Sequence, residues 1–175
     1  MIYMVEMDFP HPERLAEWHD WYLAHIRVLL TVPGFRASQR FEAVVGTHLR
    51  YLALHEVESA ALFESEAYRS RGGPASTGEW RQLQTNWHRN LLAGLDETPD
   101  VPRDAYLLVL RDALGIPAVP GGLAISWLDA VGLDRTIERC GLAVLNDPAP
   151  VLDVASRGQR IRLCRPISEK IRAPT

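Results

Sequence analysis

The order of strand-like and helix-like hydrophobic patterns in the first 95 residues constrains the fold more than any other feature of the sequence. Apolar residues alternate over residues 2–9, and over residues 12–32 they recur at three- and four-residue steps until Pro33 and Gly34. Alternation predicts a strand, whereas the longer period predicts an amphipathic helix that ends at the Pro-Gly pair. The chain therefore begins as a strand followed by a helix.

Two further alternating segments predict a hairpin. They cover residues 35–44 and 49–57, and Gly46 and Thr47 between them favour a turn. The remaining predictions for this half are helical segments over residues 60–69 and 79–88 and a fourth strand over residues 90–95. This order is that of a ferredoxin-like unit, an α+β fold in which an antiparallel sheet carries both helices on one face.

The sequence predicts two parts separated by a linker. The stretch 96–103 is polar and contains two prolines, so we expect a ferredoxin-like unit over residues 1–97 and a β-rich second half over residues 103–168. The second half is either a degenerate ferredoxin-like repeat or a β-rich annex. The sheet face without helices then needs a cover, which is either this second half or a second copy of the chain in a homodimer.

Charge and motifs exclude several classes of function. The net charge is −3, so neither nucleic acid nor an anionic membrane surface is an expected partner. The sequence shows no apolar run of about 18 residues and no signal-peptide pattern, which predicts a cytoplasmic protein. Glycine-rich nucleotide loops and nucleophile-elbow motifs are absent, and no histidine pair has a spacing that chelates a metal on one helix face. We therefore expect a small-molecule ligand and no metal or organic cofactor.

Several motifs of the first half together resemble a known family. They are Glu-Trp-His-Asp-Trp-Tyr-Leu-Ala-His at residues 17–25, Leu-Leu-Thr-Val-Pro-Gly-Phe at 29–35, Arg40-Phe41, and Tyr-Leu-Ala-Leu-His-Glu at 51–56. Over about the first 95 residues the chain resembles the EthD-like branch of the dimeric α/β-barrel superfamily. The resemblance implies that two ferredoxin-like units join their sheets into a barrel, usually across a homodimer interface. It also implies activities such as decarboxylation, dehydration or cyclisation of aromatic or polyketide-like compounds.

The first predicted helix carries the main catalytic candidate. At about 100° per residue, Trp18, Tyr22 and His25 fall on one broad face of this helix. One interpretation is that His25 gives or takes a proton in a pocket walled by Trp18 and Tyr22. The alternative is an ordinary core stripe with a histidine at its rim. Leu23 and Ala24 stand where the family often has acidic residues.

Two strands supply candidates for substrate binding. Tyr51 and His55 share one face of a strand because they are four residues apart, and either a pocket or the protein interior can take that face. On the preceding strand, Arg40 is a candidate clamp for a carboxylate or enolate, although an exposed strand arginine has the same sequence pattern.

These features favour a cofactor-independent enzyme that acts by proton transfer, of isomerase, lyase or cyclase type, on a small aromatic, lactone or polyketide-like compound. The first alternative is a non-catalytic small-molecule-binding or accessory protein on the same scaffold. The second is a haem-binding protein in which His25 or His88 ligates the iron.

Overall fold

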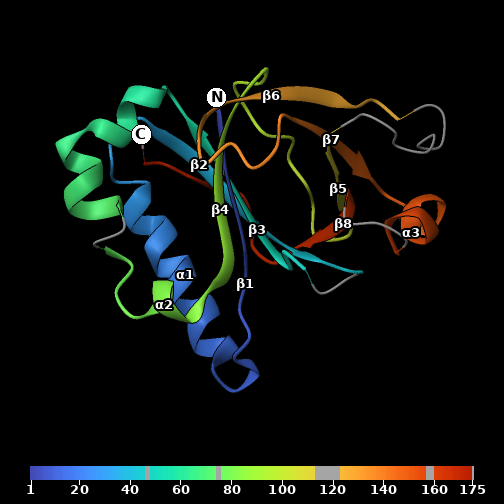
Figure 1. Ribbon diagram of the computed structural model, residues 1–175, viewed down its shortest axis with the longest axis horizontal. Coiled ribbons are helices and arrows are strands. Elements are labelled where there is room, and N and C mark those ends of the chain that lie inside the picture. Colours follow the sequence, from blue (N-terminus) through green and yellow to red (C-terminus); the bar gives the residue numbers. More distant parts are fainter. Residues whose placement is uncertain (46–47, 74–75, 113–122, 157–159, 175) are drawn as a thin grey trace.

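Eight strands form one closed ring in the computed structural model, which describes residues 1–45, 48–73, 76–112, 123–156 and 160–174 (Figure 1). All the paired strands are antiparallel, in the order β3-β1-β4-β6-β7-β5-β8-β2, and β2 pairs with β3 to close the ring. The strands are β1 (Ile2–Asp8), β2 (Phe35–Ala43), β3 (Tyr51–Val57), β4 (Thr85–Ala93), β5 (Tyr106–Arg111), β6 (Ser126–Leu133), β7 (Arg139–Leu145) and β8 (Ile161–Pro166). The two-residue strand β9 (Ile171–Arg172) adds to β2 beside the ring.

The predicted fold class is wrong. Instead of a ferredoxin-like α+β sheet with helices on one face, the chain forms a closed eight-stranded antiparallel β-barrel with few helices. The reason is that β4 pairs with β6 and β2 pairs with β8, so strands of the second half occupy both edges of the first-half sheet. The ring thus contains strands from both predicted parts, and the division at residues 97–103 stays a prediction, as does the homodimer.

The secondary structure of the first half is largely as predicted up to the hairpin. The predicted helix appears as η1 (Pro12–Arg14) and α1 (Leu15–Leu29), and β2 and β3 form the predicted antiparallel hairpin, whose turn at Gly46 and Thr47 lies outside the described residues. Beyond it, the segment predicted as one helix forms the 3-10 turn η2 (Ala60–Glu64) and the π turn η3 (Tyr68–Gly72).

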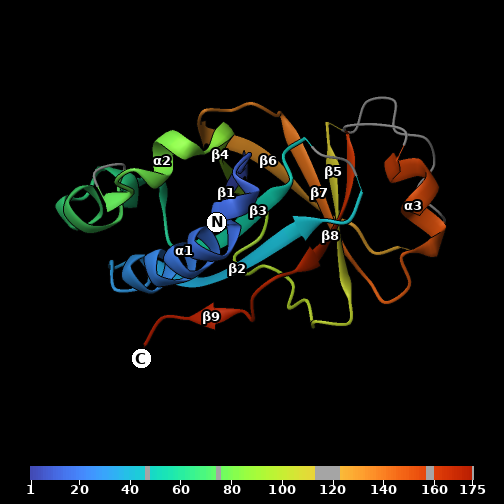
Figure 2. The ribbon, with the colours of Figure 1, turned by 90° about the horizontal axis from the view of Figure 1, so that it is seen from below.

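The predicted helix over residues 79–88 is mostly wrong. Only α2 (Trp80–Leu83) is helical, and from Thr85 the chain belongs to β4, which is hydrogen-bonded between β1 and β6. Long-range pairing overrides the local preference here. The last helix, α3 (Ala149–Ser156), lies across the barrel from α1 and α2 (Figures 1 and 2). Within the described ranges, no helix has the length and apolar character needed to cross a membrane.

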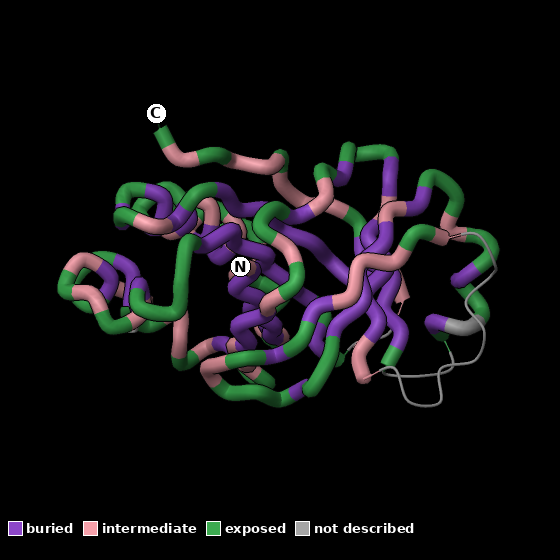
Figure 3. The backbone as a smooth tube through the Cα atoms, turned by 90° about the horizontal axis from the view of Figure 1, so that it is seen from above, coloured by how far each residue is buried: buried purple, intermediate pink, exposed green. Residues whose placement is uncertain are grey.

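Alternation along the strands divides the apolar core into an interior cluster and two outer clusters. On β1, Ile2 and Met4 point into the barrel, whereas Tyr3 and Val5 point outward beneath α1. The second outer cluster lies under α3 and includes Leu108 and Leu163. Buried backbone accordingly runs through the centre of the molecule, with exposed segments around it (Figure 3). The pocket described below lies in the layer under α1.

Two ion-pair clusters lie on the interior side of the strands. Glu6 on β1 is fully buried and accepts hydrogen bonds from Arg111, at 2.7 Å, and from Arg162. Glu56 on β3 pairs with Lys170 at 2.6 Å and accepts a hydrogen bond from the backbone of Thr98 at 2.9 Å. Each buried carboxylate is thereby matched by a cation, as the high cost of burying an isolated charge requires.

Candidate functional site

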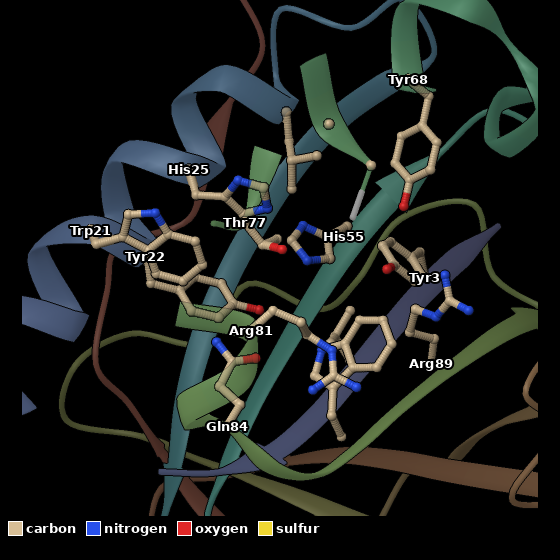
Figure 4. Close-up of a pocket in the computed structure, with 15 residues that line it drawn as sticks. Tyr3, Trp21, Tyr22, His25, His55, Tyr68, Thr77, Arg81, Gln84 and Arg89 are labelled. Carbon is tan, nitrogen blue, oxygen red and sulfur yellow. The ribbon is translucent and has the colours of Figure 1, made fainter. Parts of the chain in front are cut away.

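A pocket lies outside the barrel, between the helical segments α1, η3 and α2 and the outward face of β1, β3 and β4 (Figure 4). The approach of η3 to α1 depends on Gly72, because a Cβ added there would lie 2.7 Å from a methyl carbon of Leu29. Much of the wall is aromatic, supplied by Tyr3, Trp21, Tyr22, Tyr68 and Trp87. A pocket with flat aromatic walls suits a planar organic group.

His25 enters the pocket from α1. Its imidazole stacks on Trp21, with ring centroids 5.2 Å apart and an interplanar angle of 12°, and meets the edge of Tyr22 at 6.1 Å. Burial lowers the pKa of His25 to about 4. At neutral pH the ring is therefore uncharged and able to accept a proton.

His55 enters the same pocket from β3 and is almost fully buried. Its Nδ1 lies 2.6 Å from the Ser38 hydroxyl oxygen, and its ring stacks on Tyr3 at 5.2 Å. Burial, followed by the charges that His25 and Arg40 can carry, lowers the pKa of His55 to about 3. The two imidazoles lie beside each other (Figure 4), so protonation of one opposes protonation of the other. Because Ser38 engages Nδ1, Nε2 is the nitrogen of His55 available to a ligand.

Phenol groups provide hydrogen-bond donors next to the histidines. Burial, followed by the neighbouring phenols of Tyr68 and Tyr22, raises the pKa of Tyr3 well above its usual value. Burial likewise raises the pKa of Tyr22 to about 12. Tyr3, Tyr22 and Tyr68 all line the pocket. Because Tyr3 and Tyr22 remain protonated at neutral pH, the hydroxyl of each can donate a hydrogen bond to a ligand oxygen.

Two arginines form the cationic part of the wall. The guanidinium carbon of Arg81, on α2, lies 4.1 Å from the centroid of the Trp87 ring, and that of Arg89, on β4, lies 4.7 Å from it. Arg89 also pairs with Asp134 at 3.2 Å. No carboxylate occurs among the described residues that line the pocket.

The structure brings three of the predicted site residues together, namely Tyr22, His25 and His55, which all line the pocket. Trp18, Arg40 and Tyr51 are not among the lining residues, and they form a layer behind Tyr22. The Arg40 guanidinium stacks on Tyr22 at 4.0 Å and on Trp18 at 4.8 Å, and the rings of Trp18 and Tyr51 are 4.7 Å apart. Burial lowers the pKa of Arg40 to about 10. The predicted roles of all six residues in catalysis and binding stay predictions.

Sequence reasoning missed Tyr3, Tyr68, Arg81 and Arg89 as site residues. Two of them had a usable signal, since alternation places Tyr3 on the face of β1 opposite Met4, and Arg89 on the face of β4 opposite Asn90. Tyr68 and Arg81 come from short helical segments with no clear period. Their convergence depends on how those segments pack.

In the part of the chain that the structure describes, no three His, Cys, Asp or Glu side chains come together as a metal site. His88, a haem-ligand candidate, does not line the pocket, whereas His25 does. Haem ligation stays a prediction.

Comparisons with known proteins identify the fold. No protein-family model matches the sequence, and no curated protein matches it. A solved structure described as "Crystal structure study of anthrone oxidase-like protein" aligns over 99% of this chain and 93% of that chain, with a TM-score of 0.63. The two proteins share this fold. At 11% identity the likeness extends to the fold alone, so the EthD-like assignment is not confirmed.

Proposed function

We propose that the protein is a cofactor-independent enzyme that moves a proton on a carbon acid of a planar aromatic or polyketide-like compound. The observation that carries this proposal is the convergence of two uncharged histidines, His25 and His55, on one aromatic pocket that also contains phenol donors. Histidine is the commonest general base in enzymes, and positioned proton transfer contributes about 10²–10⁴-fold to a rate.

The proposed step uses one histidine as base and the phenols as donors. The substrate C–H bond breaks, its electron pair moves to the oxygen of an adjacent carbonyl, and the proton goes to a ring nitrogen of His25. Hydroxyl groups of the lining tyrosines, Tyr22 among them, donate hydrogen bonds to the resulting enolate oxygen. Return of a proton from the ring to another carbon gives an isomer and leaves the enzyme unchanged, and exchange of the ring proton with solvent before the return introduces deuterium when the solvent is D₂O.

The low pKa of His25 is compatible with this role. In the free protein, burial disfavours the imidazolium. When an enolate forms beside the ring, its negative charge favours the imidazolium and raises the pKa of His25 at the moment of transfer. A pocket that holds its histidines uncharged thus keeps the base form fully populated at neutral pH.

One structural similarity and one sequence resemblance support the choice of substrate. The structural neighbour is described as an anthrone oxidase-like protein, and anthrone is a flat tricyclic ketone with an acidic methylene group. The resemblance of residues 17–56 to EthD-like proteins, which we also propose reflects common ancestry, implies aromatic or polyketide-like compounds as well. Both agree with the aromatic walls of the pocket.

Exchange of substrate protons for deuterium tests the proposal. Anthrone is incubated with the protein in D₂O under argon, and loss of its methylene proton signals is followed by NMR. We expect the wild type to accelerate exchange over buffer, and His25→Gln to lose about 100-fold of that acceleration. His48→Gln is the matched control, because His48 is exposed and lies outside the pocket, and it should exchange as the wild type does.

The outcomes separate the two candidate functions. If the wild type binds anthrone without accelerating exchange, the protein is a binding or accessory protein for such compounds and the enzyme proposal fails. If His25→Gln exchanges at the wild-type rate, the proposal fails for His25 as the base.

A further inference from the structure

We propose that the ligand of this pocket carries an anionic oxygen group, a carboxylate, and that Arg81 and Arg89 bind it above the Trp87 ring. The inference deepens the proposed function, since it rests on the same pocket and adds the charge of its substrate. It starts from the two guanidinium groups that share one indole ring, at 4.1 Å and 4.7 Å from its centroid.

The charge of these two arginines is only partly neutralised by the protein. Arg89 pairs with Asp134 at 3.2 Å, and no acidic side chain of the described ranges pairs with Arg81. The Nε of Arg89 is buried without a hydrogen-bond partner. Since a buried donor costs free energy until an acceptor reaches it, a ligand oxygen at this position gains more than one at a satisfied donor.

Among the other arginines that stack on tryptophan, Arg40 has no acidic partner in the described ranges but lies outside the pocket, and the other two are neutralised. Arg14 lies 4.4 Å from the centroid of Trp80 and binds both Glu17 and Glu79, while Arg139 lies 5.0 Å from the centroid of Trp127 and pairs with Asp129. Stacking by itself therefore does not explain the excess of positive charge at Trp87. What distinguishes Arg81 and Arg89 is that they line a pocket without a carboxylate.

The geometry also gives the ligand an orientation. In Figure 4, His25 and His55 lie at one side of the pocket, and Arg81 and Arg89 approach it from the other side. A planar ring system placed between the aromatic walls would direct its carboxylate toward the arginines and its reacting carbon toward the histidines. Burial, followed by repulsion from Arg89, lowers the pKa of Arg81, and a bound carboxylate would offset that repulsion.

Paired probes that differ only in charge test the inference. Anthracene-2-carboxylate and its neutral carboxamide are titrated into the protein, and binding is followed by ligand fluorescence. We expect the carboxylate to bind the wild type about tenfold more tightly than the carboxamide, and higher salt to weaken only the carboxylate. Arg81→Gln should bind the carboxylate about tenfold more weakly while its affinity for the carboxamide stays at the wild-type value.

Arg139→Gln is the matched control, because it removes the same charge from a tryptophan-stacked arginine outside the pocket. It should leave both affinities unchanged. Equal affinities of the wild type for the two probes, no binding of the carboxylate, or an equal loss for both probes in Arg81→Gln would each overturn the inference. A carboxylate that binds as expected, in a protein that exchanges no anthrone protons, upholds the inference and rejects only the enzymatic proposal.

Discussion

Buried polar groups are charged and paired in the barrel interior, whereas in the pocket outside it they are uncharged or only partly paired. Inside, Glu6 is held by Arg111 and Arg162, and Glu56 by Lys170, so each carboxylate has a cation beside it. In the pocket, the histidines are kept uncharged by burial, and the arginine charges exceed the acids that face them. Matched charges hold the strands together, whereas unmatched groups are those a ligand can satisfy. Stability therefore depends on the interior ion pairs, and the proposed function depends on the pocket.

Removal of the Glu6 carboxylate in the barrel interior should reduce stability more than any of the substitutions that follow. Glu6→Gln should lower the free energy of unfolding by about 3–5 kcal/mol, because it leaves the buried guanidinium of Arg162 and the partly buried one of Arg111 without their carboxylate. Denaturant titration measures the loss. Glu17→Gln removes the carboxylate of an exposed pair with Arg14 and should leave stability nearly unchanged. Equal effects of the two variants would show that the interior cluster does not stabilise the barrel.

The buried histidine His55 should make the free energy of unfolding depend on pH, with an effect of intermediate size. The pKa of His55 is about 3 in the folded protein and near 6.5 in an unfolded chain, so below pH 6.5 the unfolded state binds the proton first. Stability is therefore complete above pH 6.5 and falls as the pH drops toward about 3, with a slope of about 1.4 kcal/mol per pH unit from this histidine.

Unfolding curves recorded between pH 7 and pH 5 check this prediction, in a range above the titration of most carboxylates. His55→Gln should remove the contribution of this histidine and leave that of His25, whose pKa is about 4, whereas His48→Gln, at an exposed position, should retain the full slope. A wild-type stability that does not change over this range would mean that the pocket does not hold its histidines uncharged. The comparison between pocket and interior would then break down.

The smallest effect concerns the support of His55. Ser38→Ala removes the hydroxyl that lies 2.6 Å from Nδ1 and should cost about 1 kcal/mol of unfolding free energy, the usual contribution of one hydrogen bond. Thermal unfolding at pH 7 measures it. If Ser38→Ala lowers the free energy of unfolding as much as Glu6→Gln does, the Ser38–His55 hydrogen bond is as important for stability as the interior ion pairs.

Local patterns predicted the elements of the first half better than their assembly. The period of residues 12–32 predicts α1, and alternation predicts β1, β2 and β3, because each pattern reports which side of a single element is buried. The barrel depends instead on which strand lies beside β2 and β4. The partners, β8 and β6, are distant in sequence, and no periodicity encodes such a choice.

The candidate site was predictable to the same extent. Tyr22 and His25 share a helix face, and His55 lies on the outward face of β3, so a period of three to four and a period of two were enough to select them. Arg40 shows the limit of this reasoning. It lies on the same side of the barrel as the pocket, but the sequence does not show that the Tyr22 ring stands between its guanidinium and the pocket.

The ion pairs of Glu6 also have a consequence for synthesis of the chain. Glu6 lies on β1, which leaves the ribosome before the other strands of the ring, while its two partners follow 105 and 156 residues later. The nascent chain exposes the unpaired edge of β4 until β6 emerges and that of β2 until β8 emerges, and such edges are sites of association with other strands. Ring closure is thus a late, long-range event, and chaperones that cover strand edges during translation should raise the yield of folded protein.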